Sequence, residues 1–253
     1  GSPDPLYPRY TTFPDEKMVA TQEISIDSAF FRYPYRVAVK DSIAIIMDLH
    51  NDSHYFYAFT YPECKPIAPF GKRGEAPGEM LSAEMFQFSA LDSVWTLDAN
   101  RMLITRWSVS PTDKTVLRKE EIRLDKTLVR SLDFYRTDSA FLITDYLGDF
   151  RYHKVSHSGK PIKNIGKIPT EISYEQYIHP ALAQAWRSFT DYNPKNGIYA
   201  MATQLGEALE IYNLKTQTHN VIYGPAGEPQ FIAKGGEGFP TGIKGFVLSL
   251  IHI

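Results

Sequence analysis

The stretch Phe70-Gly71-Lys72-Arg73-Gly74-Glu75-Ala76-Pro77-Gly78-Glu79-Met80 separates two groups of short apolar runs, and it predicts a turn that closes one structural unit and opens the next. Its three glycines can adopt the positive φ angles that a tight turn requires. Residues 65–72, which run into this turn, recur 95 positions later as residues 160–167, with Lys, Pro, Ile, Gly and Lys at matching places. Two separate parts of the chain share one local plan, which predicts a repeated architecture.

The composition favours strands and turns over long helices. The 253 residues include 16 Tyr and 15 Phe, which are enriched in strands, and 16 Gly and 17 Pro, which are enriched in turns. With 43% hydrophobic residues, the chain is long enough to bury a large core. We therefore expect an all-β protein.

Charge and cysteine content exclude several classes of function. The net charge of -2 provides no field that would attract nucleic acid, so we expect no nucleic-acid partner. Cys64 is the only cysteine, which rules out an intramolecular disulfide and a cysteine-rich zinc site. No apolar run approaches the roughly 18 residues of a transmembrane helix. Gly1-Ser2 resembles a cloning remnant, and we expect that a signal or lipid-anchor segment has been removed upstream.

The apolar runs fall into four sets of four predicted strands, preceded by a short strand-like piece at 23–26. The sets are 35–39, 43–47, 55–60 and 66–70; 85–90, 93–97, 102–108 and 116–124; 130–135, 140–144, 150–155 and 161–165; 189–192, 198–203, 209–213 and 220–223. An Asp ends the second strand at Asp48, Asp98 and Asp145, where its side chain can accept turn amides, and Thr203 follows in the fourth set. Four strands about every 40 to 50 residues are typical of β-propeller blades.

Two regions depart from this repeat. Ser173 and Gln176 have capping-box spacing, and helix-forming residues follow at 181–186, so we expect a short helical insertion near 172–187, interrupted near Pro180. Residues 240–253 resemble the first hairpin of a fifth unit. We expect an extended segment over 1–20 and one propeller domain over 21–253, with four complete blades and part of a fifth. The open edge would be left as a gap, or covered by a partner chain, swapped strands or self-association.

These repeats resemble the NHL and TolB-like propellers, in particular six-bladed TolB-like proteins of bacterial cell envelopes, many of which are lipoproteins. The resemblance rests on residues 35–48, 70–79 and 191–197. In NHL-type repeats an apolar-Gly-x-x-Gly turn joins the outer strand of one blade to the inner strand of the next, and residues 70–74 have this form. The resemblance implies a periplasmic or outer-membrane-anchored protein and supplies no catalytic residues. It departs from such a family at the C-terminus, where further blades would be needed.

Candidate binding residues follow from propeller geometry. Loops between second and third strands share a face with the turns between blades, and loops on a rigid scaffold are where binding usually occurs. Cationic and aromatic side chains that the repeat itself does not require would suit an acidic glycan or a peptide carboxylate. The candidates are Arg36, Lys72, Arg73, Arg136, Tyr177 and Trp186. For Lys72 and Arg73 the alternative is a solvated turn, and for the two aromatics it is packing of the insertion onto the propeller.

A metal site has weaker support. Asp48, His50, Asp52 and His54 lie within seven residues and carry groups that bind divalent cations. An ordinary polar hairpin turn explains the same residues, and no known metal-binding spacing is present. We expect no metal and no cofactor. The sequence therefore favours a non-enzymatic binding or scaffolding propeller for a protein, peptide or glycan. The alternative is a propeller-type lyase or hydrolase that uses a cation near the central channel.

Overall fold

The computed structural model describes residues 11–12, 14–26, 30–233 and 240–244, and for 231–233 and 240–244 it describes the backbone alone. The chain divides into two compact units, each of which is described by itself. Unit 1 comprises residues 1–18, 141–154 and 162–253, and unit 2 comprises residues 19–140 and 155–161. No described helix is long and apolar enough to cross a membrane.

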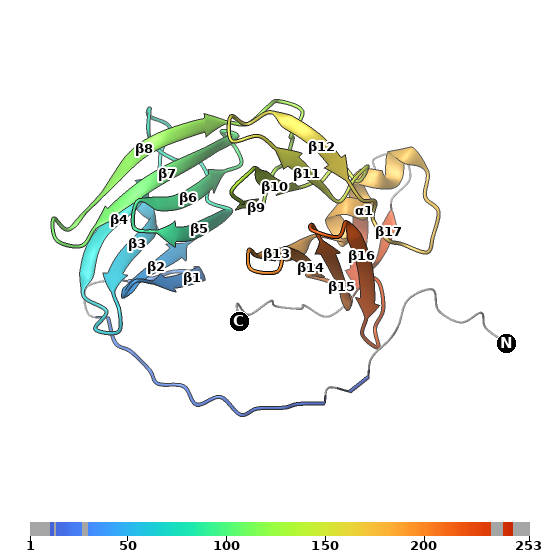
Figure 1. Ribbon diagram of the computed structural model, residues 1–253, viewed down its shortest axis with the longest axis horizontal. Coiled ribbons are helices and arrows are strands. Elements are labelled where there is room, and N and C mark those ends of the chain that lie inside the picture. The colour runs from blue at the N-terminus through green and yellow to red at the C-terminus, as the bar shows by residue number, and fades with distance from the viewer. Residues whose placement is uncertain (1–10, 13, 27–29, 234–239, 245–253) are drawn as a thin grey trace. The chain divides into compact units, whose positions relative to one another are not determined.

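Unit 2 contains two complete four-stranded antiparallel sheets, here called blades 1 and 2 (Figure 1). In each blade the strands lie in chain order. Blade 1 is formed by β1 (Pro34–Lys40), β2 (Ile43–Asp48), β3 (His54–Thr60) and β4 (Pro66–Lys72). Blade 2 is formed by β5 (Met85–Ala90), β6 (Ser93–Asp98), β7 (Leu103–Ser110) and β8 (Thr115–Arg123). Such an up-and-down sheet is the blade of a propeller.

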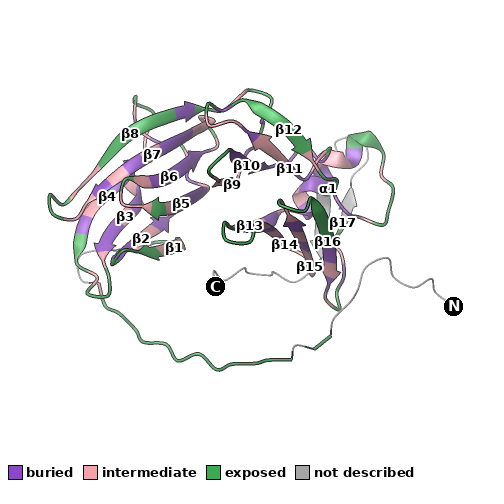
Figure 2. Cartoon of the chain, in the orientation of Figure 1, coloured by how far each residue is buried: buried purple, intermediate pink, exposed green. Residues whose placement is uncertain are grey.

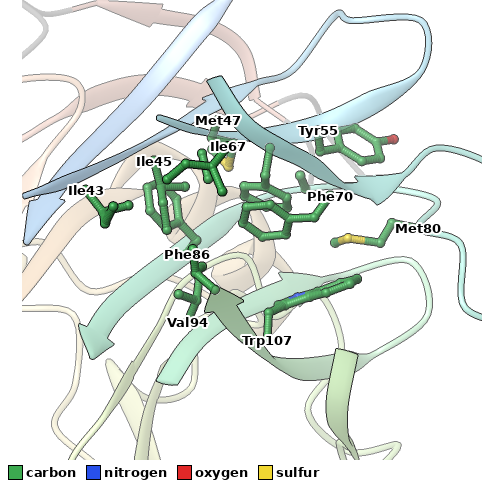
Figure 3. Close-up of a cluster of buried hydrophobic side chains, with 14 residues drawn as sticks. Ile43, Ile45, Met47, Tyr55, Ile67, Phe70, Met80, Phe86, Val94 and Trp107 are labelled. Carbon is green, nitrogen blue, oxygen red and sulfur yellow. The ribbon is translucent and has the colours of Figure 1, made fainter. Parts of the chain in front are cut away.

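The core of unit 2 lies between the facing sides of these two blades. Ile43, Ile45 and Met47 of β2 point to one side and pack with Phe86, Val94 and other buried side chains of blade 2 (Figure 3). β2 is buried at five of its six positions. A strand that is apolar at nearly every position is covered on both faces, which explains the continuous apolar run in the sequence.

The third sheet has the order β12-β11-β10-β9 and is here called blade 3. Its strands are β9 (Phe134–Arg136), β10 (Phe141–Thr144), β11 (Tyr152–Val155) and β12 (Pro161–Ile165). The prediction of a strand over 130–135 was too early in the chain. Arg130 has a φ of +58°, and the Ser131 hydroxyl donates to the Leu128 carbonyl at 2.7 Å, so a local turn occupies this region and delays the strand.

Unit 1 contains blade 4 and the helical insertion. Blade 4 is formed by β13 (Ser188–Asn193), β14 (Ile198–Thr203), β15 (Ala208–Asn213) and β16 (Thr218–Tyr223). The insertion forms η1 (Gln176–Ile178) and α1 (His179–Ala185). The predicted capping box does not form, because the cap of η1 is Glu175 without a side-chain hydrogen bond. Pro180 lies in the first turn of α1 and starts this helix rather than interrupting it.

A two-stranded antiparallel sheet follows blade 4, formed by β17 (Gln230–Ala233) and β18 (Pro240–Lys244). The all-β fold with four complete blades and part of a fifth is therefore confirmed. The prediction for the fifth unit was wrong in detail, because residues 240–244 pair with an unpredicted earlier strand, and 246–253 lie outside the described residues. Residues 23–26 form no strand and are mostly exposed, since no described strand pairs with their backbone groups.

Candidate functional site

Three aspartates, each at the end of a second strand or directly after it, bind backbone amides of nearby loops in blades 1, 2 and 3. The Asp48 carboxylate is fully buried and accepts hydrogen bonds from the amides of Arg32, Tyr33 and His50, at 2.8 to 3.1 Å. Burial alone would raise the pKa of Asp48, but these backbone bonds outweigh it and lower the pKa. Asp98 and Asp145 bind loop amides in the same way. These carboxylates are structural, and their oxygens are already occupied.

The four candidate metal ligands after β2 do not form a common site. Asp52 pairs with Arg32, and His54 contacts the hydroxyl of the neighbouring Ser53 at 3.1 Å. The Asp48 carboxylate faces the backbone amides described above. Across the described part of the chain, no three His, Cys, Asp or Glu side chains gather as a metal would require.

The basic residues of the 70–80 turn bind the turn itself. Lys72 pairs with Glu79 at 2.7 Å. Arg73 lies over the ring of Tyr55, 4.3 Å from its centroid, and donates to the carbonyl of Leu49 at 2.6 Å. The Arg73 amide also donates to the Ser53 carbonyl, so this turn and the 48–53 loop share one face of unit 2, as the sequence predicts. Both cations therefore support the turn rather than stand free for a ligand.

Arg136 is positioned differently, because its side chain has no polar partner in the described part of the chain. It lies at the end of β9, the innermost strand of blade 3. The side-chain amide of Gln87 on β5 holds its backbone, accepting from the Arg136 amide at 2.7 Å and donating to the Arg136 carbonyl at 3.1 Å. The guanidinium lies 4.9 Å from the ring centroid of Trp95, and the Arg136 Nε is buried without a hydrogen-bond acceptor. A cation is thus held in place by an aromatic ring and a fixed backbone.

Arg36 is a second arginine on an innermost strand of unit 2. It is half-buried on β1, and its guanidinium lies 5.4 Å from the centroid of the Tyr35 ring. β1 contacts β5, and β5 contacts β9, so the three inner strands lie side by side (Figure 1). We call the set Arg36, Gln87 and Arg136, with the rings of Tyr35 and Trp95, the inner-strand site. Inner strands of propellers surround the central channel, a common place for ligands.

The two aromatic candidates of the insertion have opposite environments. Trp186 has no exposed surface and belongs to a cluster that includes Leu182, Ala208 and Tyr223, so it packs the insertion against blade 4. Tyr177, on η1, is 57% exposed. Gln176 and His179 both bind Asp149 in the β10–β11 loop, which fixes the insertion within unit 1.

Unit 1 also holds a buried ion pair that the sequence analysis did not identify. Arg151 Nη2 lies 2.6 Å from Glu210 Oε2, with both side chains almost fully buried. Burial opposes both charges, but the opposite charge of the partner outweighs it, so the pKa of Glu210 is lowered and that of Arg151 is raised. The pair is surrounded by further bonds, including one from the Tyr212 hydroxyl to Glu210 and one from Arg151 to Ser188 Oγ. It is a closed structural network.

Sequence reasoning named the two arginines of the inner-strand site but missed Gln87 and both of its aromatic supports. Gln87 interrupts the apolar run Met85-Phe86-Gln87-Phe88 of a predicted inner strand, and this single polar residue was the available signal. Tyr35 and Trp95 gave no signal, because aromatic residues are common in every strand of this chain.

The fold and the inner-strand site together define a β-propeller whose inner strands carry arginines. Residues 12–251 match the family model described as TolB-like 6-blade propeller-like, and the chain belongs to this family. This confirms the resemblance drawn from the sequence. No curated protein matches the chain.

The comparison with solved structures finds similar chains at low sequence identity. A putative exported protein from Bacteroides fragilis is 13% identical with a TM-score of 0.55, and the match covers 80% of this chain and 54% of that one. A member of a family of unknown function from Bacteroides vulgatus is 6% identical with a TM-score of 0.49, covering 85% and 61% of the two chains. Glutaminyl cyclase from Myxococcus xanthus is 13% identical with a TM-score of 0.44, covering 85% and 89%. The chain spans 54%, 40% and 50% of the first three solved structures that it matches.

Proposed function

We propose that this chain is a non-enzymatic binding propeller of the bacterial cell envelope, and that the inner-strand site binds a carboxylate of a peptide or an acidic glycan. The observation that carries this proposal is the guanidinium of Arg136, which lies over Trp95 and whose buried Nε has no hydrogen-bond acceptor among the described residues. The envelope location is supported by membership of the TolB-like family and by the likeness to a putative exported protein.

A fixed guanidinium suits carboxylate recognition for two reasons. Its planar set of donors matches the two oxygens of a carboxylate, so two parallel hydrogen bonds can form. Gln87 holds the Arg136 backbone and the guanidinium itself lies over the Trp95 ring, so binding loses less side-chain entropy than it would for an unsupported arginine. Arg36 adds a second positive charge to the inner strands of unit 2, on β1, which contacts β5 as β9 does.

The residues of the proposed site differ from those expected from the sequence. Lys72 and Arg73 are engaged by Glu79 and by the Leu49 carbonyl, and Trp186 is buried, so these three are not used. Tyr177 belongs to unit 1 and is not part of the inner-strand site. Gln87, Tyr35 and Trp95 take their places as the residues that orient the two arginines.

Isothermal titration calorimetry on the full chain tests the proposal. The probes are trigalacturonate and a tetra-alanine peptide with a free C-terminus, compared with methyl-esterified trigalacturonate and the C-terminally amidated peptide. We expect at least one anionic probe to bind and its neutral counterpart to fail. Arg36→Ala or Arg136→Ala should weaken binding about tenfold or more, since a hydrogen bond to a charged group contributes about 1.5–3 kcal/mol.

Lys163→Ala is the matched control, because Lys163 is an exposed cation on β12, outside the inner-strand site. It should leave the affinity unchanged. Equal binding of charged and neutral probes, binding of neither anionic probe, or wild-type affinity in both arginine variants would rule out carboxylate recognition at this site.

A further inference from the structure

A groove of about 760 Å³ lies at the outer side of unit 2, away from the inner strands. One wall is the end of β8 and the residues that follow it, from Glu120 to Lys126. The other wall is the turn that contains His157, Ser158 and Lys160. The groove belongs to no feature described above, and all of its lining residues lie in unit 2.

The two walls are joined tightly at the end of β8. The Asp125 amide donates to the Gly159 carbonyl at 2.9 Å. Gly159 has a φ of +85°, and a Cβ added there would lie 2.1 Å from the carbonyl oxygen of Arg123. Only glycine permits this approach, so the turn is held against the strand end and the groove has a fixed shape.

β8 itself presents a free edge. It is the last strand of its sheet and pairs with β7 alone. It has nine residues, more than any other described strand, and most of it is exposed (Figure 2). Within the described part of the chain, residues 115–123 make no backbone hydrogen bond beyond those of their own sheet. A strand edge of this length is a template for another extended segment.

The charges along this edge favour an acidic partner. Glu120 is paired with Arg106 at 3.1 Å, and Glu121 is paired with Arg118. Asp125 is bonded by the amide and hydroxyl of Thr127 and by Lys160, which lowers its pKa to about 2. The carboxylates of the groove are therefore satisfied within the protein.

Two cations of the groove remain available. Arg123 and Lys126 are both exposed, and neither makes an ion pair or a side-chain hydrogen bond with another described residue. The groove's lining residues and their ion-pair partners comprise five Lys and Arg against three Asp and Glu, which leaves an excess of two positive charges. Mixed charges alone would oppose pairing of the strand edge with another chain. The excess of positive charge at one end instead favours a partner segment with negative charge.

We propose that the free edge of β8 pairs with an extended acidic segment of a partner protein, whose carboxylates bind Arg123 and Lys126 at the groove. Backbone pairing with the edge would supply affinity, and the two cations would set register and select sequence. A peptide fits better than a polysaccharide, because only a peptide backbone can satisfy the row of amides and carbonyls on a strand edge.

Fluorescence anisotropy with the full chain provides the test. The probe is a dye-labelled nine-residue peptide that alternates valine and glutamate, compared with the same peptide carrying lysine in place of glutamate. We expect the glutamate peptide to bind at least about tenfold more tightly. The double variant Arg123→Glu, Lys126→Glu should weaken its binding by about tenfold or more, since each lost charged contact is of the order of one decade in affinity.

Lys163→Glu reverses a matched exposed cation on the outer strand of blade 3, so it should leave binding unchanged. Hydrogen exchange then distinguishes strand pairing from charge attraction, because the amides of residues 115–123 should exchange more slowly in the saturated complex. The proposal would be overturned by unchanged exchange at 115–123 or by full affinity in the double variant. It would also be overturned if polygalacturonate, added at a galacturonate concentration equal to that of the peptide, displaced the peptide completely. Exchange elsewhere in the double variant should match that of the wild type, which confirms its folding.

Discussion

Substitution of Asp98 by Ala should destabilise blade 2 far more than the loss of an ordinary surface carboxylate. The Asp98 side chain is 3% exposed and is the acceptor for three groups. It binds the Leu81 amide at 2.7 Å, the Arg101 amide at 3.0 Å and the Ser82 hydroxyl at 3.0 Å. Together these bonds join the entry of β5 to the end of β6 and the turn after it, so one carboxylate holds three segments of chain.

The magnitude follows from what Ala would leave behind. A hydrogen bond to a charged acceptor contributes about 1.5–3 kcal/mol, and a buried donor left without a partner costs about 1–3 kcal/mol. Leu81 and Ser82 are not fully buried, so water can replace part of the loss. We expect the free energy of unfolding to fall by about 3 kcal/mol for Asp98→Ala and by about half of that for Asp98→Asn, which keeps one acceptor oxygen.

Urea unfolding followed by tryptophan fluorescence measures this effect, because Trp95 and Trp107 are buried in blade 2 itself. At a slope of about 2 kcal/mol per molar urea, the expected loss lowers the midpoint by about 1.5 M. Asp138→Ala is the control, since Asp138 is exposed in the turn before β10. If Asp98→Ala moves the midpoint no further than the control does, the structural role assigned to the strand-end aspartates is wrong.

Three further predictions concern a close contact, a buried charge and a titration. Gly71→Ala should lower the free energy of unfolding by about 2–4 kcal/mol, because Gly71 has a φ of +63° and the new Cβ would lie 2.7 Å from Phe56. In Gly197→Ala the nearest atoms to the new Cβ belong to the flexible Lys215 side chain, so the loss should be about 1 kcal/mol. Chemical denaturation measures both losses. Glu210→Gln should cost about 3–5 kcal/mol by leaving Arg151 buried without its partner, and Glu210→Leu combined with Arg151→Met should recover most of that loss in thermal melts. Burial lowers the pKa of His153, but its bonds to Asp145 and Asn164 outweigh this and raise the pKa. Its contribution to stability should thus be complete below pH 6.5 and lost as the pH rises through the pKa in the folded state; a His153→Gln variant whose stability has the same pH dependence as the wild type would contradict this.

The repeat could be predicted from the sequence because each of its units is marked by short local patterns. A strand that is apolar throughout, an Asp at its end and a glycine turn are each recognised from a few neighbouring residues. β5, β12 and β14 have the bounds that the sequence predicted. Errors arose where a tertiary partner decides the outcome. Residues 23–26 have strand-like residues but no neighbouring strand, and β17 has a partner ten residues further along the chain that no local pattern indicated.

The candidate site was less predictable, because cations that look alike in the sequence have different surroundings. Lys72 and Arg73 carry the same charge as Arg136, but Lys72 is paired with Glu79 and Arg73 donates a hydrogen bond to the Leu49 carbonyl. Trp186 is an aromatic residue in an insertion, as a stacking residue would be, but it packs the core of unit 1. Which charge is paired and which ring is buried depends on contacts between distant strands, such as Gln87 with Arg136, and these contacts have no signature in the spacing of residues.

The most direct test of the proposed function is the nuclear magnetic resonance signal of the Arg136 Nε–Hε group during titration with trigalacturonate or free-C-terminus tetra-alanine. This group lies in the guanidinium that the proposal assigns to the ligand, and Arg136→Lys identifies its resonance by removing it. The account predicts that the resonance moves in a saturable way, with the same dissociation constant as calorimetry gives. Saturable binding of either probe while the Arg136 resonance stays in place would contradict carboxylate recognition at the inner-strand site.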